Sequence, residues 1–361
     1  MRYSPRLIRF LTAGMIGLAG VLGASQGTAA PAPPISATGI NLADTDYPYA
    51  VSHLTLDAPA GPVDMAYMDI APKNGDSDAP TIVLLHGKNF SGAYWGDTAA
   101  WLSARGWRVI APDQIGFGKS DKPRAYSYTF AHLAENTHAL LKALGISRAT
   151  VLGHSMGGML ATRFALMYPT LTEQLVLVDP IGLEDWKAKG VPYRGMSAWY
   201  ARELKKDYAG IRAYQEKSYY HGTWKPAYEP WARMLAGMYA SDGRKRLAWV
   251  GAATYDMIYN EPVVYEFGRL AMPTTLIVGA LDRTALGKDL VAPEVAARLG
   301  DYPQLSKQAV AAMPHGQRVL MDGLGHLPFI EAPERFYDML AKTLGKPAGN
   351  APETTATDDD T

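Results

Sequence analysis

Gly153-His154-Ser155-Met156-Gly157-Gly158 is the stretch of sequence that decides the fold. It follows residues 149–152, which have the apolar character of a short buried strand, and it precedes residues 159–168, which have helical spacing. A Gly-x-Ser-x-Gly sequence between a strand and a helix predicts the nucleophile elbow of a serine hydrolase. The turn is sharp, and the glycines keep Cβ atoms out of it. The sequence therefore predicts a serine hydroxyl exposed above the carboxyl ends of parallel strands.

Strands and helices alternate along most of the remaining chain. Expected strands are residues 63–70 in an N-terminal antiparallel hairpin, 81–85, 108–111, 149–152, 174–178, 274–278 and 318–321, and expected helices are 96–104, 130–144, 159–168, 305–313 and 333–344. This alternation predicts the α/β class, with a mostly parallel central sheet covered by helices on both faces.

Residues 181–268 interrupt the alternation. They show helical periodicity without a strand pattern, and they hold 11 of the 21 tyrosines and 5 of the 8 tryptophans. A helical block inserted between two sheet strands predicts a cap over the carboxyl edge, where open α/β sheets bind their ligands. The aromatic residues favour a mostly apolar substrate, although the same rings could equally form the core of the cap.

The two ends of the chain differ from the rest in composition. Residues 1–29 resemble a secretory signal, because three arginines precede an apolar run at 10–24 and small residues lead up to a cleavage site near Ala29. We therefore expect a periplasmic or secreted protein, with an uncleaved anchor as the alternative. The expected division is signal peptide 1–29, linker 30–45, first part of the core 46–180, helical cap 181–268, second part of the core 269–345 and disordered tail 346–361.

Charge excludes some classes of partner. Without the three arginines of the leader, 32 basic side chains face 35 acidic ones, and no basic run occurs along the chain. The sequence therefore argues against nucleic acid as a partner and against stable membrane insertion after signal removal. It leaves the oligomeric state open.

A serine hydroxyl needs a base within hydrogen-bond reach and a third group that orients the base. In sheets of this type the chain order is serine, acid, histidine. Asp282 follows the strand at 274–278, and His326 lies in a glycine-containing loop after the final strand, so Ser155, Asp282 and His326 are the expected catalytic residues. Asp179, which also stands at a strand end, is the alternative acid.

Acyl transfer also needs donors for the developing oxyanion. We expect one donor to be the backbone N–H of Met156, directly after the nucleophile, and the other to be the backbone N–H of Lys88, in the loop after the first central strand. This chemistry requires no metal ion and no organic cofactor.

Five blocks of sequence together resemble the α/β-hydrolase superfamily over residues 46–344. They are Leu85-His86-Gly87, residues 112–120, the elbow at 153–158, residues 278–282 and Gly325-His326. The block at 116–120 is similar to the branch of haloalkane dehalogenases and epoxide hydrolases, which use an aspartate nucleophile. This chain has Ser155 in that position. A serine attacking an alkyl carbon would form an ether that water cannot open, so the resemblance to that branch does not imply its chemistry.

The leading hypothesis is an exported carboxylesterase that cleaves a small, mostly apolar ester through an acyl-enzyme. A proline iminopeptidase-like exopeptidase, a lactonase or an amidase could use the same triad. The exopeptidase would need cap carboxylates to hold a free amino terminus, and Glu203, Glu216, Glu229 and Glu261 are scattered candidates. From another class, a ligand-binding receptor on a hydrolase scaffold remains an alternative.

Overall fold

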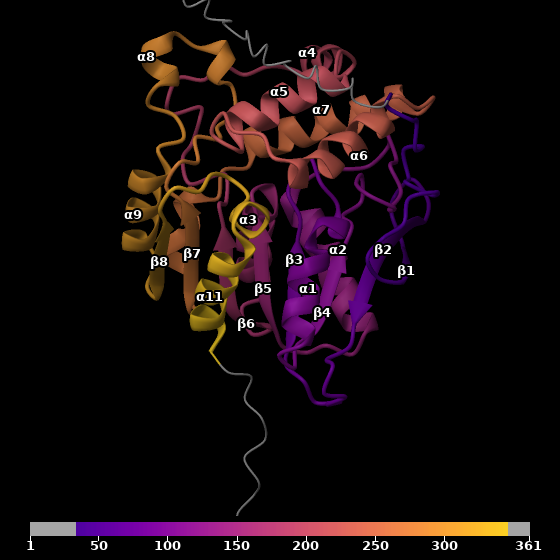
Figure 1. Cartoon of the computed structure of the whole chain (residues 1–361), viewed down its shortest axis with the longest axis vertical. Coiled ribbons are helices and arrows are strands. Elements are labelled where there is room, and N and C mark those ends of the chain that lie inside the picture. The colour runs from indigo at the N-terminus through magenta and orange to yellow at the C-terminus, as the bar shows by residue number, and fades with distance from the viewer. Residues whose placement is uncertain (1–33, 346–361) are drawn as a thin grey trace, which may run out of the picture. The chain divides into compact units, whose positions relative to one another are not determined.

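The computed structural model describes residues 34–345, so the expected signal peptide and the tail at 346–361 lie outside the described residues. Eight strands form one sheet in the order β1-β2-β4-β3-β5-β6-β7-β8 (Figure 1). The strands are β1 (Val51–Leu56), β2 (Val63–Ile70), β3 (Thr81–Leu85), β4 (Arg108–Pro112), β5 (Ala149–His154), β6 (Thr172–Val178), β7 (Thr274–Gly279) and β8 (Gly316–Met321). Strand β2 is antiparallel to β1 and β4, and the pairs from β4 to β8 are parallel, which confirms the expected fold class.

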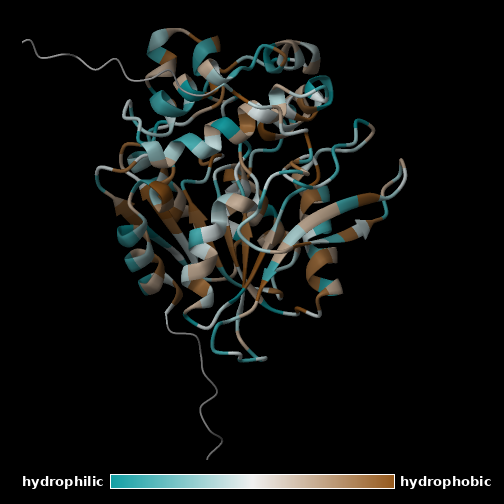
Figure 2. Cartoon of the chain, turned by 45° about the vertical axis from the view of Figure 1, so that its right-hand side comes forward, coloured by the Kyte–Doolittle hydropathy of each residue, from teal (hydrophilic) through white to brown (hydrophobic). Residues whose placement is uncertain are grey.

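Side chains alternate between two cores, one on each face of the sheet. In β3, Ile82 and Leu84 join one cluster, whereas Val83 and Leu85 join the other. Successive residues of a strand point to opposite faces, and helices on both faces demand an apolar side chain at every position. All residues of β3 are accordingly buried. Figure 2 shows the same concentration of hydrophobic residues along the strands.

Helices cover both faces. One cluster packs α2, α3 and α9 against the sheet, and the other packs α1 and α11 against the opposite face. These and the short helices of the core are η1 (Gly92–Trp95), α1 (Gly96–Ser103), α2 (Phe130–Ala143), α3 (Met156–Met167), η4 (Lys288–Leu290), α8 (Pro293–Ala296), α9 (Tyr302–Ala312), α10 (Pro328–Glu331) and α11 (Pro333–Leu344). Helix α9 begins at Tyr302, three residues before the predicted start at residue 305. Pro303 is tolerated there because, in the first turn, its missing N–H removes no helical hydrogen bond.

The chain between β6 and β7 forms a helical layer, which we call the cap. It contains α4 (Met196–Glu203), α5 (Tyr208–Ser218), η2 (Pro226–Tyr228), α6 (Glu229–Tyr239), α7 (Arg244–Asn260) and η3 (Val264–Arg269). Helices α4 to α7 lie over one end of the sheet (Figure 1). The cap has a hydrophobic cluster of its own, which joins residues of α5, α6 and α7. The inserted segment is therefore a packed layer that roofs the sheet edge.

Part of the segment that sequence analysis treats as a linker packs against this cap. Leu42 is fully buried in the cap's cluster, and Ile40 packs at its edge. The backbone N–H of Thr38 donates to the Gly237 carbonyl. Apolar side chains among the small residues give this segment something to bury, which its Pro/Ala-rich beginning does not reveal. Within residues 34–345, no helix is both long enough and apolar enough to cross a membrane.

The turn between β5 and α3 positions Ser155 through close backbone packing. Ser155 has φ 56° and ψ −120°, a region that non-glycine residues rarely adopt. A Cβ at Gly157 would lie 2.2 Å from the Leu85 carbonyl oxygen, and a Cβ at Gly153 would lie 2.1 Å from the Gly157 carbonyl oxygen. Both clashes are with backbone. Only glycine at these positions lets β5, its helix and β3 approach as they do, and this approach holds the serine in its strained conformation.

We expect Gly157→Ala to lower the free energy of unfolding by about 1–3 kcal/mol, because overpacking against the fixed backbone of β3 cannot be relieved by a side-chain rotation. Denaturant unfolding measures this change. Gly268→Ala is the matched control, since its added Cβ would meet its nearest heavy atom, the Ala312 carbonyl oxygen, at an ordinary contact distance of 3.6 Å. Equal stability of the two variants would contradict the packing account of the elbow.

Candidate active site

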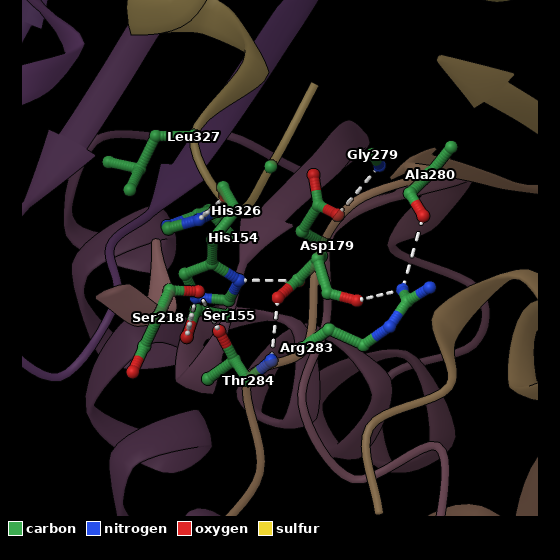
Figure 3. A network of polar contacts seen from close by, with 12 residues as sticks. His154, Ser155, Asp179, Ser218, Gly279, Ala280, Arg283, Thr284, His326 and Leu327 are labelled. Atoms are coloured by element: carbon green, nitrogen blue, oxygen red, sulfur yellow. Dashed lines mark hydrogen bonds and ion pairs between the residues drawn. The ribbon is translucent and has the colours of Figure 1, made fainter. Parts of the chain in front are cut away.

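Three side chains from different strand ends meet in one hydrogen-bonded series, and Figure 3 labels two of them, Ser155 and His326. The His326 Nε2 lies 2.9 Å from the Ser155 Oγ, and its Nδ1 lies 2.7 Å from an Asp282 carboxylate oxygen. His326 and Asp282 are fully buried, and Ser155 is 6% exposed. The structure thus brings together the three residues that chain order singled out. A base in contact with a hydroxyl, and oriented by a carboxylate, can activate that hydroxyl as a nucleophile.

The Asp282 carboxylate is held from two sides. One oxygen faces His326, and the other accepts a hydrogen bond from the Thr284 backbone N–H at 2.8 Å. The loop that carries it is fixed by the hydrogen bond from the Leu281 N–H to the Leu324 carbonyl. These contacts hold the carboxylate in one orientation.

Asp179, the alternative acid, lies beside this pair but makes different contacts. One of its oxygens accepts from the Gly279 backbone N–H at 2.8 Å, and the other is buried without a hydrogen-bond partner within residues 34–345. Burial, and then the negative charge of Asp282, raise the pKa of Asp179 well above its usual value. At neutral pH we therefore assign the negative charge to Asp282 and a protonated carboxyl to Asp179.

The same three side chains, Asp179, Asp282 and His326, offer atoms that lie within 4.8 Å of one another and could in principle hold a metal ion. Two of these groups, however, already form the direct hydrogen bond between His326 and Asp282. A protonated carboxyl is also a poor ligand, because metal ligands must be deprotonated. The donor set therefore fits a proton relay better than a metal site.

The two N–H groups expected to bind an oxyanion are free donors. Within the described chain, neither the Lys88 nor the Met156 backbone N–H donates to another protein group. Met156 is the first residue of α3, where the N–H has no partner within the helix. Lys88, Asn89 and Ser155 line the same cavity. Both N–H groups remain our assignment for the oxyanion donors.

A series of buried hydrogen bonds through Tyr94 and His154, here called the polar relay, lies beneath the site and was not predicted from the sequence. The Tyr94 hydroxyl accepts from the Gly87 backbone N–H at 2.9 Å and lies 3.0 Å from the His154 Nδ1. The His154 Nε2 lies 2.8 Å from the His326 carbonyl oxygen. Burial lowers the pKa of His154 well below its usual value, so this ring is neutral and donates through Nε2. The relay links the loop after β3 to the loop that carries His326, and no motif in the sequence marks Tyr94.

Tyr219, at the end of cap helix α5, is a second contact that the sequence does not reveal. Its ring stacks on His326 with centroids 4.7 Å apart, and its carbonyl accepts from the His326 backbone N–H at 2.8 Å. Its hydroxyl accepts from the Asn89 side chain at 2.7 Å. One cap residue therefore touches both the base and the loop of Lys88. Only the folded position of the cap brings it there.

The cavity above Ser155 has a volume of about 420 Å³. Its floor is formed by Ser155, Lys88 and Asn89, and its roof is formed by cap residues such as Trp199 and Tyr255. Such a volume holds a small molecule and not a folded polymer. The site therefore combines a buried nucleophile with a roofed pocket.

Known proteins resemble this chain in sequence and in structure. A family model described as alpha/beta hydrolase fold matches residues 80–333. The chain is 30% identical over 293 residues to an uncharacterized protein of Mycobacterium tuberculosis (strain ATCC 25618 / H37Rv), an alignment that covers 73% of this chain and 75% of that protein. It is 27% identical over 266 residues to Lipase 1 of Psychrobacter immobilis, covering 72% of this chain and 75% of the lipase.

Among solved structures, a probable hydrolytic enzyme from Pseudomonas aeruginosa PAO1 superposes with a TM-score of 0.84. The two sequences are 51% identical, and the match covers 86% of this chain and 99% of the other. This likeness extends from the sheet through the cap, because almost the whole of that chain is matched.

Replacement of each acid by its amide tests the assignment of charge. We expect Asp282→Asn to lower kcat by about 10³–10⁴-fold, because the amide no longer stabilises the correct tautomer and the imidazolium of His326. We expect Asp179→Asn to change kcat by less than about tenfold, because an amide resembles the protonated carboxyl already present. Steady-state kinetics on an accepted ester measure both. An equal or larger loss in Asp179→Asn would assign the acid to Asp179 instead.

Proposed function

The chain belongs to the alpha/beta hydrolase family, and from this premise we propose that it is a carboxylesterase with Ser155 as its nucleophile. The observation that carries the proposal is the position of His326, within hydrogen-bond distance of both the Ser155 hydroxyl and the Asp282 carboxylate. A roofed cavity that opens onto the hydroxyl supports a small-molecule substrate.

The proposed reaction proceeds through an acyl-enzyme. The Ser155 Oγ attacks the ester carbonyl while the His326 Nε2 takes the hydroxyl proton, and Asp282 stabilises the resulting imidazolium. The N–H groups of Lys88 and Met156 donate to the oxyanion. His326 then returns the proton to the departing alcohol. Water then attacks the acyl-serine while the His326 Nε2 takes a proton from it. The proton passes to the Ser155 Oγ as the acid is released, which restores the hydroxyl.

The exopeptidase alternative gains no support from the cap. Within the described chain, none of the four glutamates named as candidates lines the cavity that contains Ser155. They pair elsewhere: Glu203 with Lys206, Glu216 with Arg212, Glu229 with Tyr208 and Trp224, and Glu261 with the Phe130 N–H. A free amino terminus would therefore find no glutamate in the pocket to bind it. Lactones and amides remain substrates that the same side chains could process.

A ligand-binding receptor would not require a reactive hydroxyl at Ser155. A binding protein would need the pocket but not a hydroxyl in contact with a base, so the hydrogen bond to His326 favours catalysis. We also propose that the enzyme acts in the periplasm or outside the cell. That proposal depends on the sequence of residues 1–29, which lie outside the described residues.

We expect Ser155→Ala to lower kcat for every accepted ester by about 10⁴-fold or more, because the nucleophile is removed. A panel of 4-nitrophenyl esters, lactones and proline arylamides measures activity and ranks the bond types. A fluorophosphonate probe should label the native protein and fail to label the variant.

Ser147→Ala is the matched control, since Ser147 is exposed and lies outside the cavity of Ser155. Native-like turnover by Ser155→Ala on all esters would eliminate the proposed mechanism. An absence of labelling in the native protein, together with tight binding of a ligand, would favour the receptor.

A further inference from the structure

The cavity above Ser155 is rich in positive charge. Five basic side chains line it, against a single acidic one: Lys88, Arg202, Lys217, Arg283 and Lys288 face Asp289. The whole chain, in contrast, has 35 basic and 35 acidic residues. The excess of positive charge is thus a property of this cavity and not of the protein's composition.

Most of these cations lack a carboxylate that would neutralise them. Within residues 34–345, no ion pair joins Lys217, Arg283 or Lys288 to a carboxylate. The Arg283 guanidinium donates to the carbonyls of Ala280 and Asp282, and the Lys288 ammonium donates to the Arg283 carbonyl. Carbonyls orient these groups but leave their charges uncompensated. Arg202 alone pairs closely with a carboxylate, that of Asp289.

Among the basic side chains of the cavity that have no close carboxylate, Lys88 is the most deeply buried. Its side chain is only 10% exposed, and its ammonium lies over the Tyr255 ring, 3.8 Å from the centroid. Its nearest carboxylate, Glu203, is 4.0 Å away and already pairs with Lys206 at 2.8 Å. Burial lowers the pKa of Lys88 to about 7, although the charge of Glu203 acts in the opposite direction. Near neutral pH the side chain is therefore only partly protonated, and an anion bound beside it would favour the ammonium form.

A charge on a little-exposed side chain such as Lys88 interacts strongly with a ligand, since water screens it less than a charge at the surface. We propose that the substrate of this site is an ester that carries a second, ionised acid group, and that Lys88 is the principal contact of that group. Lys217, Arg283 and Lys288 add to the positive potential that attracts it. A carboxylate and a phosphate share this chemistry.

This inference rests on the proposed esterase function and narrows its substrate class. The aromatic residues of the cap predict a mostly apolar substrate. Trp199 and Ile258 do line the cavity, so an apolar segment still has a place. The substrate that fits both features has an apolar portion and an anionic end, as in a monoester of a dicarboxylic acid.

Matched esters test the inference directly. The 4-nitrophenyl monoester of glutaric acid and 4-nitrophenyl valerate share a leaving group and have acyl chains of equal length, but only the first is anionic. We expect kcat/KM for the anionic ester to exceed that for the neutral ester by about tenfold or more, as for hydrogen bonds to charged groups. The ratio should fall as the salt concentration rises, because salt screens the attraction.

Two variants assign the effect to the cavity. Lys88→Met, which removes the charge at similar length, should reduce the anionic-to-neutral ratio more than the loss of any other lining charge, and Lys88→Arg should restore part of it. Lys288→Gln tests the surrounding potential if Lys88→Met does not fold, and it should reduce the ratio in part. Lys245→Gln is the control. Lys245 is exposed on cap helix α7 and does not line the cavity, so the same loss of one charge should leave the ratio unchanged.

Binding to the Ser155→Ala protein tests the inference without turnover. Calorimetry should show glutarate binding at least about tenfold more tightly than its neutral diamide, glutaramide. Inorganic phosphate serves as the second probe, and the tighter of the two anions identifies the acid group.

The possible failures are distinct. If the neutral ester is hydrolysed as well as the anionic one, or glutarate binds no better than glutaramide, the anionic substrate is overturned and the esterase stands. If no ester of either kind is hydrolysed, the esterase proposal falls, and the binding measurement alone decides whether the cavity takes an anion.

Discussion

The position of the His326 imidazole is the constraint on which the site depends. The ring must reach a hydroxyl after β5 and a carboxylate after β7, and it does so through its two nitrogens. The backbone around it is held from both sides, by His154 beneath and by Tyr219 of the cap above. Sheet and cap are therefore both needed to orient one side chain. A cap that carries such a contact is part of the reaction centre as well as its cover.

Two buried acids a short distance apart differ in charge because their partners differ. Asp282 accepts a hydrogen bond from a backbone N–H and faces an imidazole, so both of its oxygens have partners. Asp179 has a single N–H partner and lies next to the charge of Asp282, so its protonated form is favoured. Two carboxylates this close cannot both remain ionised without a nearby cation. Environment, and not residue type, separates their proposed roles.

Local pattern and chain order predicted the sheet, and they selected the three residues that meet at its edge. The three lie together because each follows the carboxyl end of a strand, directly or within five residues, and the parallel topology brings these ends to one edge. Tyr94, Tyr219 and the charge of the cavity could not be predicted in this way. They depend on how loops and cap helices pack on the sheet, and residues of α4, α5 and the segment after β7 contribute cations that are unrelated in sequence.

The cap leaves the sheet after β6 and returns to it at β7, and these two strands are paired neighbours. Because the two strands are parallel, the chain leaves at the carboxyl end of β6 and re-enters at the amino end of β7, so the insertion lies within one crossover connection and interrupts no strand. Such an arrangement allows one roof to be exchanged for another during evolution, or by grafting, without altering the register of any strand. The contacts of Tyr219 define what a transplanted roof would have to reproduce, whereas Arg202 and Lys217, the two basic residues that the cap adds to the cavity, would change with the roof. Ser155, His326 and Lys88 all lie outside the exchangeable segment and would stay in place beneath any new roof.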